Sequence, residues 1–169
     1  MFISLRFLLD SISDCPPDKK AIPGTSDGTF FFKQSKVFFS ISSALVQECG
    51  MVPIVEPEVL MDGDHSAKDC YNKTSEVIKK CFDELILHKV DLKGIILKPN
   101  MILAGNKSKD KISNEEVAKL TLKCLKSSVP SEVPGIAFLS GGQSEIEATE
   151  NLDLINKNND TNFIISYSY

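Results

Sequence analysis

The chain has 169 residues, of which 42% are hydrophobic and 25% charged, the balance of an ordinary globular domain with room for a buried core. Its net charge of −4 gives no basic footprint for nucleic acid, and its apolar runs fall short of the roughly 20 residues of a membrane-spanning helix. Five cysteines, an odd number without metal-type spacing, are typical of reduced thiols, so we expect a cytoplasmic protein without a metal site.

Residues 1–33 are the part of the chain that the sequence places least well. The opening run, MFISLRFLLD, is apolar but brief, contains an arginine and lacks a small-residue cleavage site, so we do not expect a signal peptide. Turn-forming residues follow at 15–18 and 24–28. Apolar residues then recur at helical spacing up to Gly50, which predicts a helix over about 35–49. We therefore expect an atypical N-terminal segment, 1–33, before the body of a single domain, 34–169.

From residue 51 onward the chain repeats a unit of one strand and one helix. Short apolar runs predict strands at 52–55, 95–97, 135–139 and 163–167. Apolar positions at helical spacing predict a helix between each pair of strands, and Ser113 with Glu116 predicts a capping box at the start of the second of these helices. One helix per crossover is typical of a parallel sheet with its helices outside.

Polar residues follow three of these strands, where the carboxyl ends of parallel strands form the edge that binds ligands. They are Glu56 and Glu58, then Lys98, and then Ser140, Gly141 and Gly142.

Lys98 follows an apolar strand, and apolar neighbours disfavour the charged form of its amine, as Schiff-base chemistry with a carbonyl substrate requires. The Ser-Gly-Gly turn precedes a helix, so its N–H groups can hold a phosphate. Each feature also has a structural alternative: a lysine that reaches solvent, solvated acids and a tight turn.

Four blocks of sequence resemble class I fructose-1,6-bisphosphate aldolase. They are VPIVEPEVL (52–60), DGDH (62–65), LKPNM (97–101) and FLSGGQS (138–144), within a resemblance that runs from about Cys49 to Tyr169. The resemblance implies a TIM barrel and a glycolytic lyase that cleaves fructose 1,6-bisphosphate to dihydroxyacetone phosphate and glyceraldehyde 3-phosphate. It also implies that the enzyme uses neither a metal nor a cofactor, because a lysine iminium is the electron sink.

The resemblance also implies a role for each candidate residue. Lys98 is the expected Schiff-base lysine. Glu56 is the expected proton-transfer residue, and Glu58 tunes the lysine and its charges. The turn that follows the third strand, at 140–142, is expected to grip a substrate phosphate.

The chain departs from the family in its first part. The strands from residue 51 match the second half of the barrel, whereas the family's early strands, with an essential aspartate and cationic side chains, have no counterpart, and no replacement strands are evident. We therefore expect an α/β protein with a partial TIM barrel of about four C-terminal βα units, a truncated chain with impaired activity. Its open sheet edges favour self-association or association with full-length aldolase. The alternative is an inactive aldolase remnant that binds a sugar phosphate or a protein.

Overall fold

The structure, a computed structural model, describes residues 2–9, 28–109 and 111–168, with side chains from Phe38 onward. In chain order the elements are β1 (Phe2–Leu9), α1 (Gly28–Glu48), β2 (Val52–Val59), α2 (Ala67–Leu87), a short 3-10 helix (Leu92–Gly94), β3 (Ile96–Leu97), α3 (Asn114–Ser128), β4 (Gly135–Phe138), α4 (Glu145–Lys157) and β5 (Ile164–Tyr167). The strands form one parallel sheet in the order β1-β2-β3-β4-β5, so neighbours in the chain are neighbours in the sheet.

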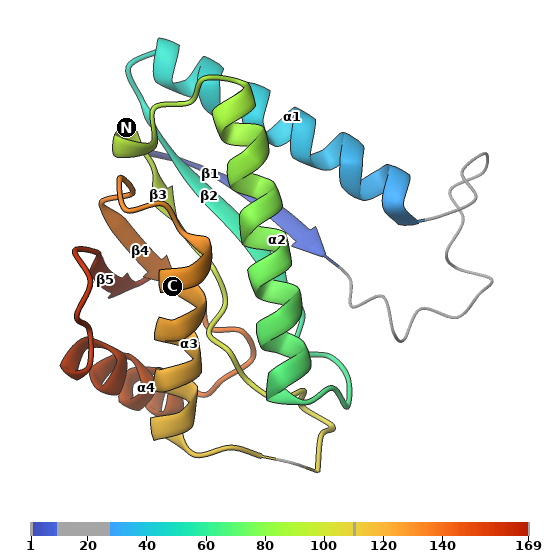
Figure 1. Ribbon diagram of the computed structural model, residues 1–169, viewed down its shortest axis with the longest axis vertical. Coiled ribbons are helices and arrows are strands. Elements are labelled where there is room, and N and C mark those ends of the chain that lie inside the picture. The colour runs from blue at the N-terminus through green and yellow to red at the C-terminus, as the bar shows by residue number, and fades with distance from the viewer. Residues whose placement is uncertain (1, 10–27, 110, 169) are drawn as a thin grey trace.

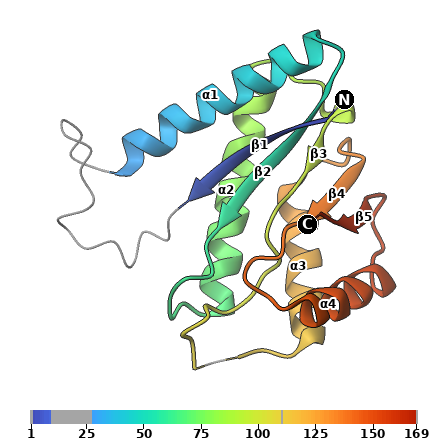
Figure 2. The ribbon, with the colours of Figure 1, turned by 180° about the vertical axis from the view of Figure 1, so that it is seen from behind.

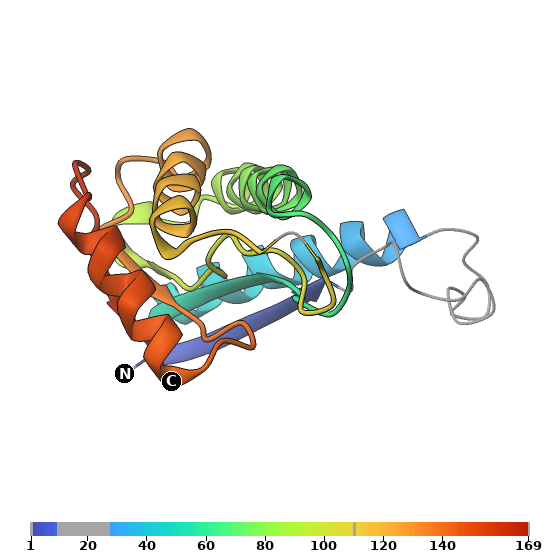
Figure 3. The same cartoon turned by 90° about the horizontal axis from the view of Figure 1, so that it is seen from below.

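The helices cover one face of this sheet in the order of the strands. α2 and α3 lie side by side, α1 runs along the β1–β2 end, and α4 flanks β4 and β5 (Figures 1 and 3). Seen from behind, β1 to β3 face the viewer, and in the described part of the chain no helix covers them (Figure 2). A parallel sheet with helices on its outer face is part of a (β/α)8 architecture, so the predicted fold class is confirmed. No described helix is both long and apolar enough to cross a bilayer.

The N-terminal part of the sheet departs from the expectation. Residues 2–9 form β1, which pairs in parallel with all of β2, so the expectation of no replacement strand is wrong. The run is almost continuously apolar, which is the pattern of a strand buried in a parallel sheet. The strand was not predicted because Arg6 interrupts the run and because apolar and polar residues do not alternate in it. α1 begins at Gly28 and runs across the boundary expected between 33 and 34. The turns expected between 15 and 27 lie outside the described residues.

Alternate residues of each strand separate the two faces of the sheet. Val55, Leu97 and Ile136 point toward the helices, are at most 1% exposed and belong to one core cluster. A side chain of this kind contributes about 1.5–3 kcal/mol when it is fully buried. The opposite face, called the inner face below, carries the residues between them: Ile54, Glu56, Glu58, Ile96, Lys98, Ala137, Ile164 and Ser166.

The helix ends follow from local sequence. α1 ends where Gly50 adopts a φ of +70°, while Gly50 N–H donates to Gln47 O at 2.9 Å and Met51 N–H donates to Val46 O at 3.0 Å. This paired arrangement is a Schellman motif, and it confirms Gly50 as the predicted stop.

The N-terminal caps were predicted less well. Ser113 accepts a hydrogen bond from Glu116 N–H, but the Glu116 carboxylate pairs with Lys119 at 3.3 Å instead of returning to the cap. Complete capping boxes occur at the starts of α2 and α4, where Ser66 pairs with Asp69 and Ser144 pairs with Glu147.

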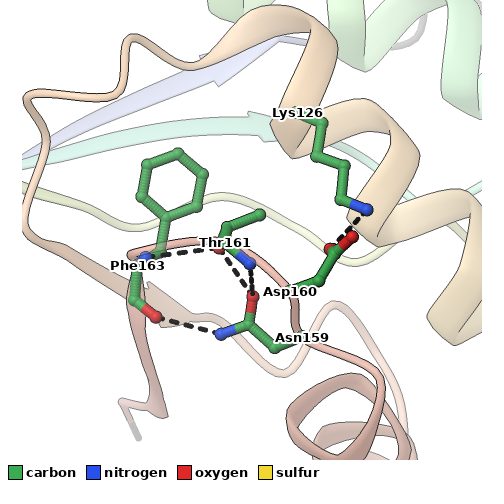
Figure 4. A network of polar contacts seen from close by, with 5 residues as sticks. All are labelled: Lys126, Asn159, Asp160, Thr161 and Phe163. Atoms are coloured by element: carbon green, nitrogen blue, oxygen red, sulfur yellow. Dashed lines mark hydrogen bonds and ion pairs between the residues drawn. The ribbon is translucent and has the colours of Figure 1, made fainter.

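Side-chain hydrogen bonds to the backbone hold the turn before β5 (Figure 4). Asn159 Oδ1 accepts from Thr161 N–H at 3.0 Å and from the Thr161 hydroxyl at 2.6 Å, and Asn159 Nδ2 donates to Phe163 O at 3.0 Å. Asp160 also forms an ion pair with Lys126 of α3. The turn therefore sets the direction in which β5 enters the sheet and ties it to α3.

Candidate functional site

The centre of the site is an ion pair on the inner face between two neighbouring strands. β3 ends at Leu97, and the next backbone N–H, that of Lys98, still donates to Val55 O at 2.6 Å, so Lys98 stays in the ladder. Its Nζ lies 3.3 Å from Glu56 Oε1, and the two side chains are 15% and 8% exposed. An amine and a carboxylate at this distance, largely out of water, can exchange a proton with each other or with a bound molecule.

The sequence suggested that Glu56 and Glu58 lie just past the end of a strand. In the structure both lie inside β2. β2 continues to Val59 because its pairing with β1 extends to the register of Leu9 with Val59. Both glutamates point to the inner face, and Glu58 is 8% exposed. The Glu58 carboxylate therefore lies two residues closer to the carboxyl end of β2 than Glu56, which forms the ion pair.

The Ser-Gly-Gly turn lies between β4 and α4, as predicted. Gly141 and Gly142 have φ values of +56° and +78°, a left-handed backbone that favours glycine at both positions. Ser140 O accepts from Gln143 N–H at 3.1 Å and from Gln143 Nε2 at 3.0 Å, which closes the turn. Successive N–H groups in such a backbone form a concave site for an anion.

The segments after β2, β3 and β4 converge at one edge of the sheet. A Cβ built on Gly141 would lie 3.8 Å from Met61 Cγ, so the loop after β2 reaches the turn after β4. Leu139 N–H donates to Pro99 O at 3.2 Å, which ties the end of β4 to the residue after Lys98. The structure thus gathers the three predicted segments at one edge, with direct contact between Lys98 and Glu56.

The two loops that frame this edge are joined by backbone hydrogen bonds. Gly105, Asn106 and Lys107 N–H groups donate to the carbonyls of the loop after β2, each at 2.9 Å. The approach is so close that a Cβ on Gly105 would lie 2.3 Å from Gly63 O. The DGDH block at 62–65 is therefore part of a rigid frame around the site.

Two buried polar residues behind the site were missed by the sequence reasoning about function. Asn100 is 2% exposed, and its Oδ1 accepts from Val59 N–H at 3.0 Å. Asn151 of α4, also 2% exposed, donates to Gln143 Oε1 at 2.7 Å and so braces the Ser-Gly-Gly turn. The available signal was a polar residue at an apolar position: Asn151 lies at helical spacing on a buried helix face, where an amide needs partners.

The electrostatics of the turn come from the cap of α4. The backbone N–H of Ser144 and then its hydroxyl bond the carboxylate of Glu147 and lower its pKa, with a smaller contribution from the charge of Lys111. The capping box uses the N–H groups of Ser144 and Glu147, so these two are not available to an anion at the turn. In the described part of the chain, no His, Cys, Asp or Glu cluster of three or more has the arrangement of a metal site.

Comparison with known proteins agrees with this geometry. A family model for fructose-bisphosphate aldolase class-I matches residues 33–169. A probable fructose-bisphosphate aldolase class 1 from Xanthomonas campestris is 44% identical over 127 residues, which is 75% of this chain and 38% of the relative. Fructose-bisphosphate aldolase C from Carassius auratus is 49% identical over 114 residues, 68% of this chain and 31% of the relative.

The fold is also found in a solved aldolase structure. Fructose-bisphosphate aldolase from Plasmodium falciparum, in complex with TRAP and a small molecule inhibitor, matches 99% of this chain and 46% of its own length, with a TM-score of 0.82 and 34% identity. The chain spans about a third of the length of the two curated relatives. The resemblance carried by the four sequence blocks is confirmed, and the chain belongs to the class I fructose-bisphosphate aldolase family.

Proposed function

We propose that the chain is an aldolase-type carbon–carbon lyase in which Lys98 forms a Schiff base with a sugar phosphate. The substrate is fructose 1,6-bisphosphate in the cleavage direction, and the products are glyceraldehyde 3-phosphate and dihydroxyacetone phosphate. One observation carries the proposal: in a chain of this family, the amine of Lys98 lies 3.3 Å from the Glu56 carboxylate, and both are largely buried.

The chemistry needs one amine and one proton carrier. The Lys98 nitrogen adds to the carbonyl carbon, Glu56 protonates the resulting hydroxyl, and water leaves to give an iminium. Loss of the proton from the hydroxyl on C4 then breaks the C3–C4 bond. Glyceraldehyde 3-phosphate leaves, and the electron pair of the bond moves into the iminium to give an enamine. Protonation of the enamine and hydrolysis of the iminium release dihydroxyacetone phosphate and restore the free amine. We assign the proton transfers to Glu56, and to Glu58 the tuning of charge beside it.

Ser140, Gly141 and Gly142 bind a substrate phosphate in this proposal. The left-handed φ values of the two glycines support it, because that backbone turns N–H groups toward a common point. The brace from Asn151 to Gln143 supports it as well, since an anion site gains from donors that are already fixed in place.

Borohydride trapping tests the proposal directly. The purified chain is incubated with dihydroxyacetone phosphate, reduced, and examined by intact mass and peptide mapping. We expect one ligand-sized gain in mass on the peptide that carries Lys98, and none in Lys98→Arg, which keeps the cation beside Glu56 but not the nucleophilic amine. Cleavage of fructose 1,6-bisphosphate is then measured. No adduct under conditions in which a full-length aldolase is trapped would overturn the proposal.

We also propose a cytoplasmic location and self-association. Cys49, Cys70, Cys81 and Cys124 are free, and burial raises the pKa of the Cys70 and Cys124 thiols, so these two stay protonated and inert at neutral pH. Reduced thiols support a cytoplasmic protein. Among the described strands, β1 and β5 each have one neighbour, and such edges favour pairing with a second chain.

A further inference from the structure

The ladder between β2 and β3 is interrupted beside the proposed nucleophile. Val55 O accepts from Lys98 N–H at 2.6 Å, which is the last regular bond of the ladder. The next β2 residue whose backbone faces β3 is Pro57. Proline has no N–H to donate, so β2 cannot supply the next bond of the ladder at the level of the site.

A side chain takes the place of the missing backbone bond. Asn100 Oδ1 accepts from Val59 N–H at 3.0 Å, beyond the gap that Pro57 leaves. Its Nδ2 donates to Thr74 Oγ1 of α2 at 3.2 Å and to Met101 O at 3.0 Å, so the amide has partners on both of its ends. Asn100 is 2% exposed, and a buried amide held by several partners has a fixed orientation.

We propose that Asn100 is a positioning residue for the Schiff-base reaction: its side chain holds the Lys98 segment in register with the segment that carries Glu56 and Glu58. This inference rests on the proposed function of Lys98. Asn100 itself does not touch the reacting atoms. Asn100 lies two residues after Lys98, and its bond partner Val59 follows Glu58 directly. The bond therefore joins the two segments at the point where the backbone ladder between them has ended. A nucleophile displaced by about 1 Å loses a large part of its rate.

The chain offers a matched control for this bond. Thr121 Oγ1 accepts from Ile102 N–H at 3.0 Å, so it is also a buried side-chain oxygen that satisfies a backbone N–H of a neighbouring segment. Thr121 bonds a residue of the loop that follows β3, and it makes no bond to β2 in the described part of the chain. Thr121→Val and Asn100→Ala therefore each leave one buried N–H without its acceptor, and Asn100→Ala also removes the bonds to Thr74 and Met101. Only Asn100→Ala removes the bond between the segment that carries Lys98 and the segment that carries Glu56 and Glu58.

The experiment measures the rate of borohydride-trapped adduct against dihydroxyacetone phosphate concentration. We expect Asn100→Ala to lower the maximal rate at least about tenfold, with the half-saturating concentration within about twofold, because the phosphate turn is untouched. Asn100→Asp keeps the acceptor for Val59 N–H but loses the donors to Thr74 and Met101, so it is expected to recover part of the rate. Thr121→Val is expected to remain within about twofold of the unchanged chain.

Amide hydrogen exchange on the same proteins gives a readout that does not need the reaction. We expect Asn100→Ala to speed exchange at the amides of Val59 and Lys98, and Thr121→Val to speed it at Ile102 alone. Unchanged exchange at Lys98 in Asn100→Ala would overturn the inference. So would a normal trapping rate in Asn100→Ala, or an equal loss in Thr121→Val. If the unchanged chain forms no adduct, the proposed function fails, and exchange at Lys98 alone decides whether Asn100 holds the segment.

Discussion

At the scale of single residues, the ion pair of Lys98 and Glu56 has consequences for stability as well as for chemistry. Both side chains are largely out of water, so the loss of one partner leaves the other charge buried without compensation. We expect Glu56→Gln to lower the free energy of unfolding by about 3 kcal/mol. The double variant Glu56→Gln with Lys98→Met removes both charges and is expected to be more stable than Glu56→Gln alone.

Urea denaturation of the single and double variants measures this coupling. Additive losses from Glu56→Gln and Lys98→Met would contradict it, because they would show that the two charges do not interact in the folded chain. The same Glu56→Gln protein is expected to form the trapped adduct about a hundredfold more slowly, since it has no carboxylate to protonate the leaving hydroxyl.

The candidate site was predictable where chemistry and strand position coincide. Lys98, Glu56 and the Ser-Gly-Gly turn each follow or end a recognisable apolar run, so their shared edge follows from the parallel order of the strands. Asn100 acts on a backbone N–H that is 41 positions away in sequence, and that partner depends on strand register. Sequence pattern reports which residues are apolar, but it does not report which backbone groups are left unpaired.

At the scale of elements, the two loops that frame the site are joined too closely to accept a larger residue. A Cβ on Gly105 would lie 2.3 Å from Gly63 O, which is backbone and cannot move aside as a side chain could. We expect Gly105→Ala to lower the free energy of unfolding by about 1–3 kcal/mol, because the loops must separate. Gly135→Ala is the control, since its nearest neighbour, Ile164 O, would be 3.9 Å away, and we expect a change within about 0.5 kcal/mol.

Thermal and urea denaturation of both variants test the frame. Equal stability of Gly105→Ala and Gly135→Ala would show that the loops are not held at the distance described. Because Met61 of the same frame approaches Gly141, we also expect Gly105→Ala to raise the concentration of dihydroxyacetone phosphate needed for half-maximal trapping.

The elements themselves were predicted best where periodicity and end signals agree. The helices after Ser66, Ser113 and Ser144 combine an amphipathic face with a capping serine. β1 shows no alternation of apolar and polar residues, and its partner strand begins 50 residues later in the sequence. A strand of that kind is defined by its neighbour in the sheet, which local pattern does not contain.

At the scale of the whole molecule, the inner face of the sheet is unevenly covered. Glu56 and Glu58 are buried near the β1–β2 end, whereas Ile164 on β5 is 75% exposed. In a closed barrel the inward residues pack against one another in layers. The described strands therefore combine a filled end, where the ion pair lies, with an apolar open end at β5, the strand that has one neighbour.

This open end predicts how the chain associates. An apolar side chain on the inner face of an edge strand favours contact with a second copy, which can cover Ile164 and pair with the free edge of β5 at once. We expect light scattering to give a mass that is a multiple of 18.6 kDa. Ile164→Lys is expected to shift the mass toward one chain, because a charge on an edge strand opposes pairing. Ile146→Lys is the control, since Ile146 is 72% exposed on α4 and away from the sheet. A single-chain mass for the unchanged protein, or equal dissociation by both substitutions, would show that β5 is not the surface of association.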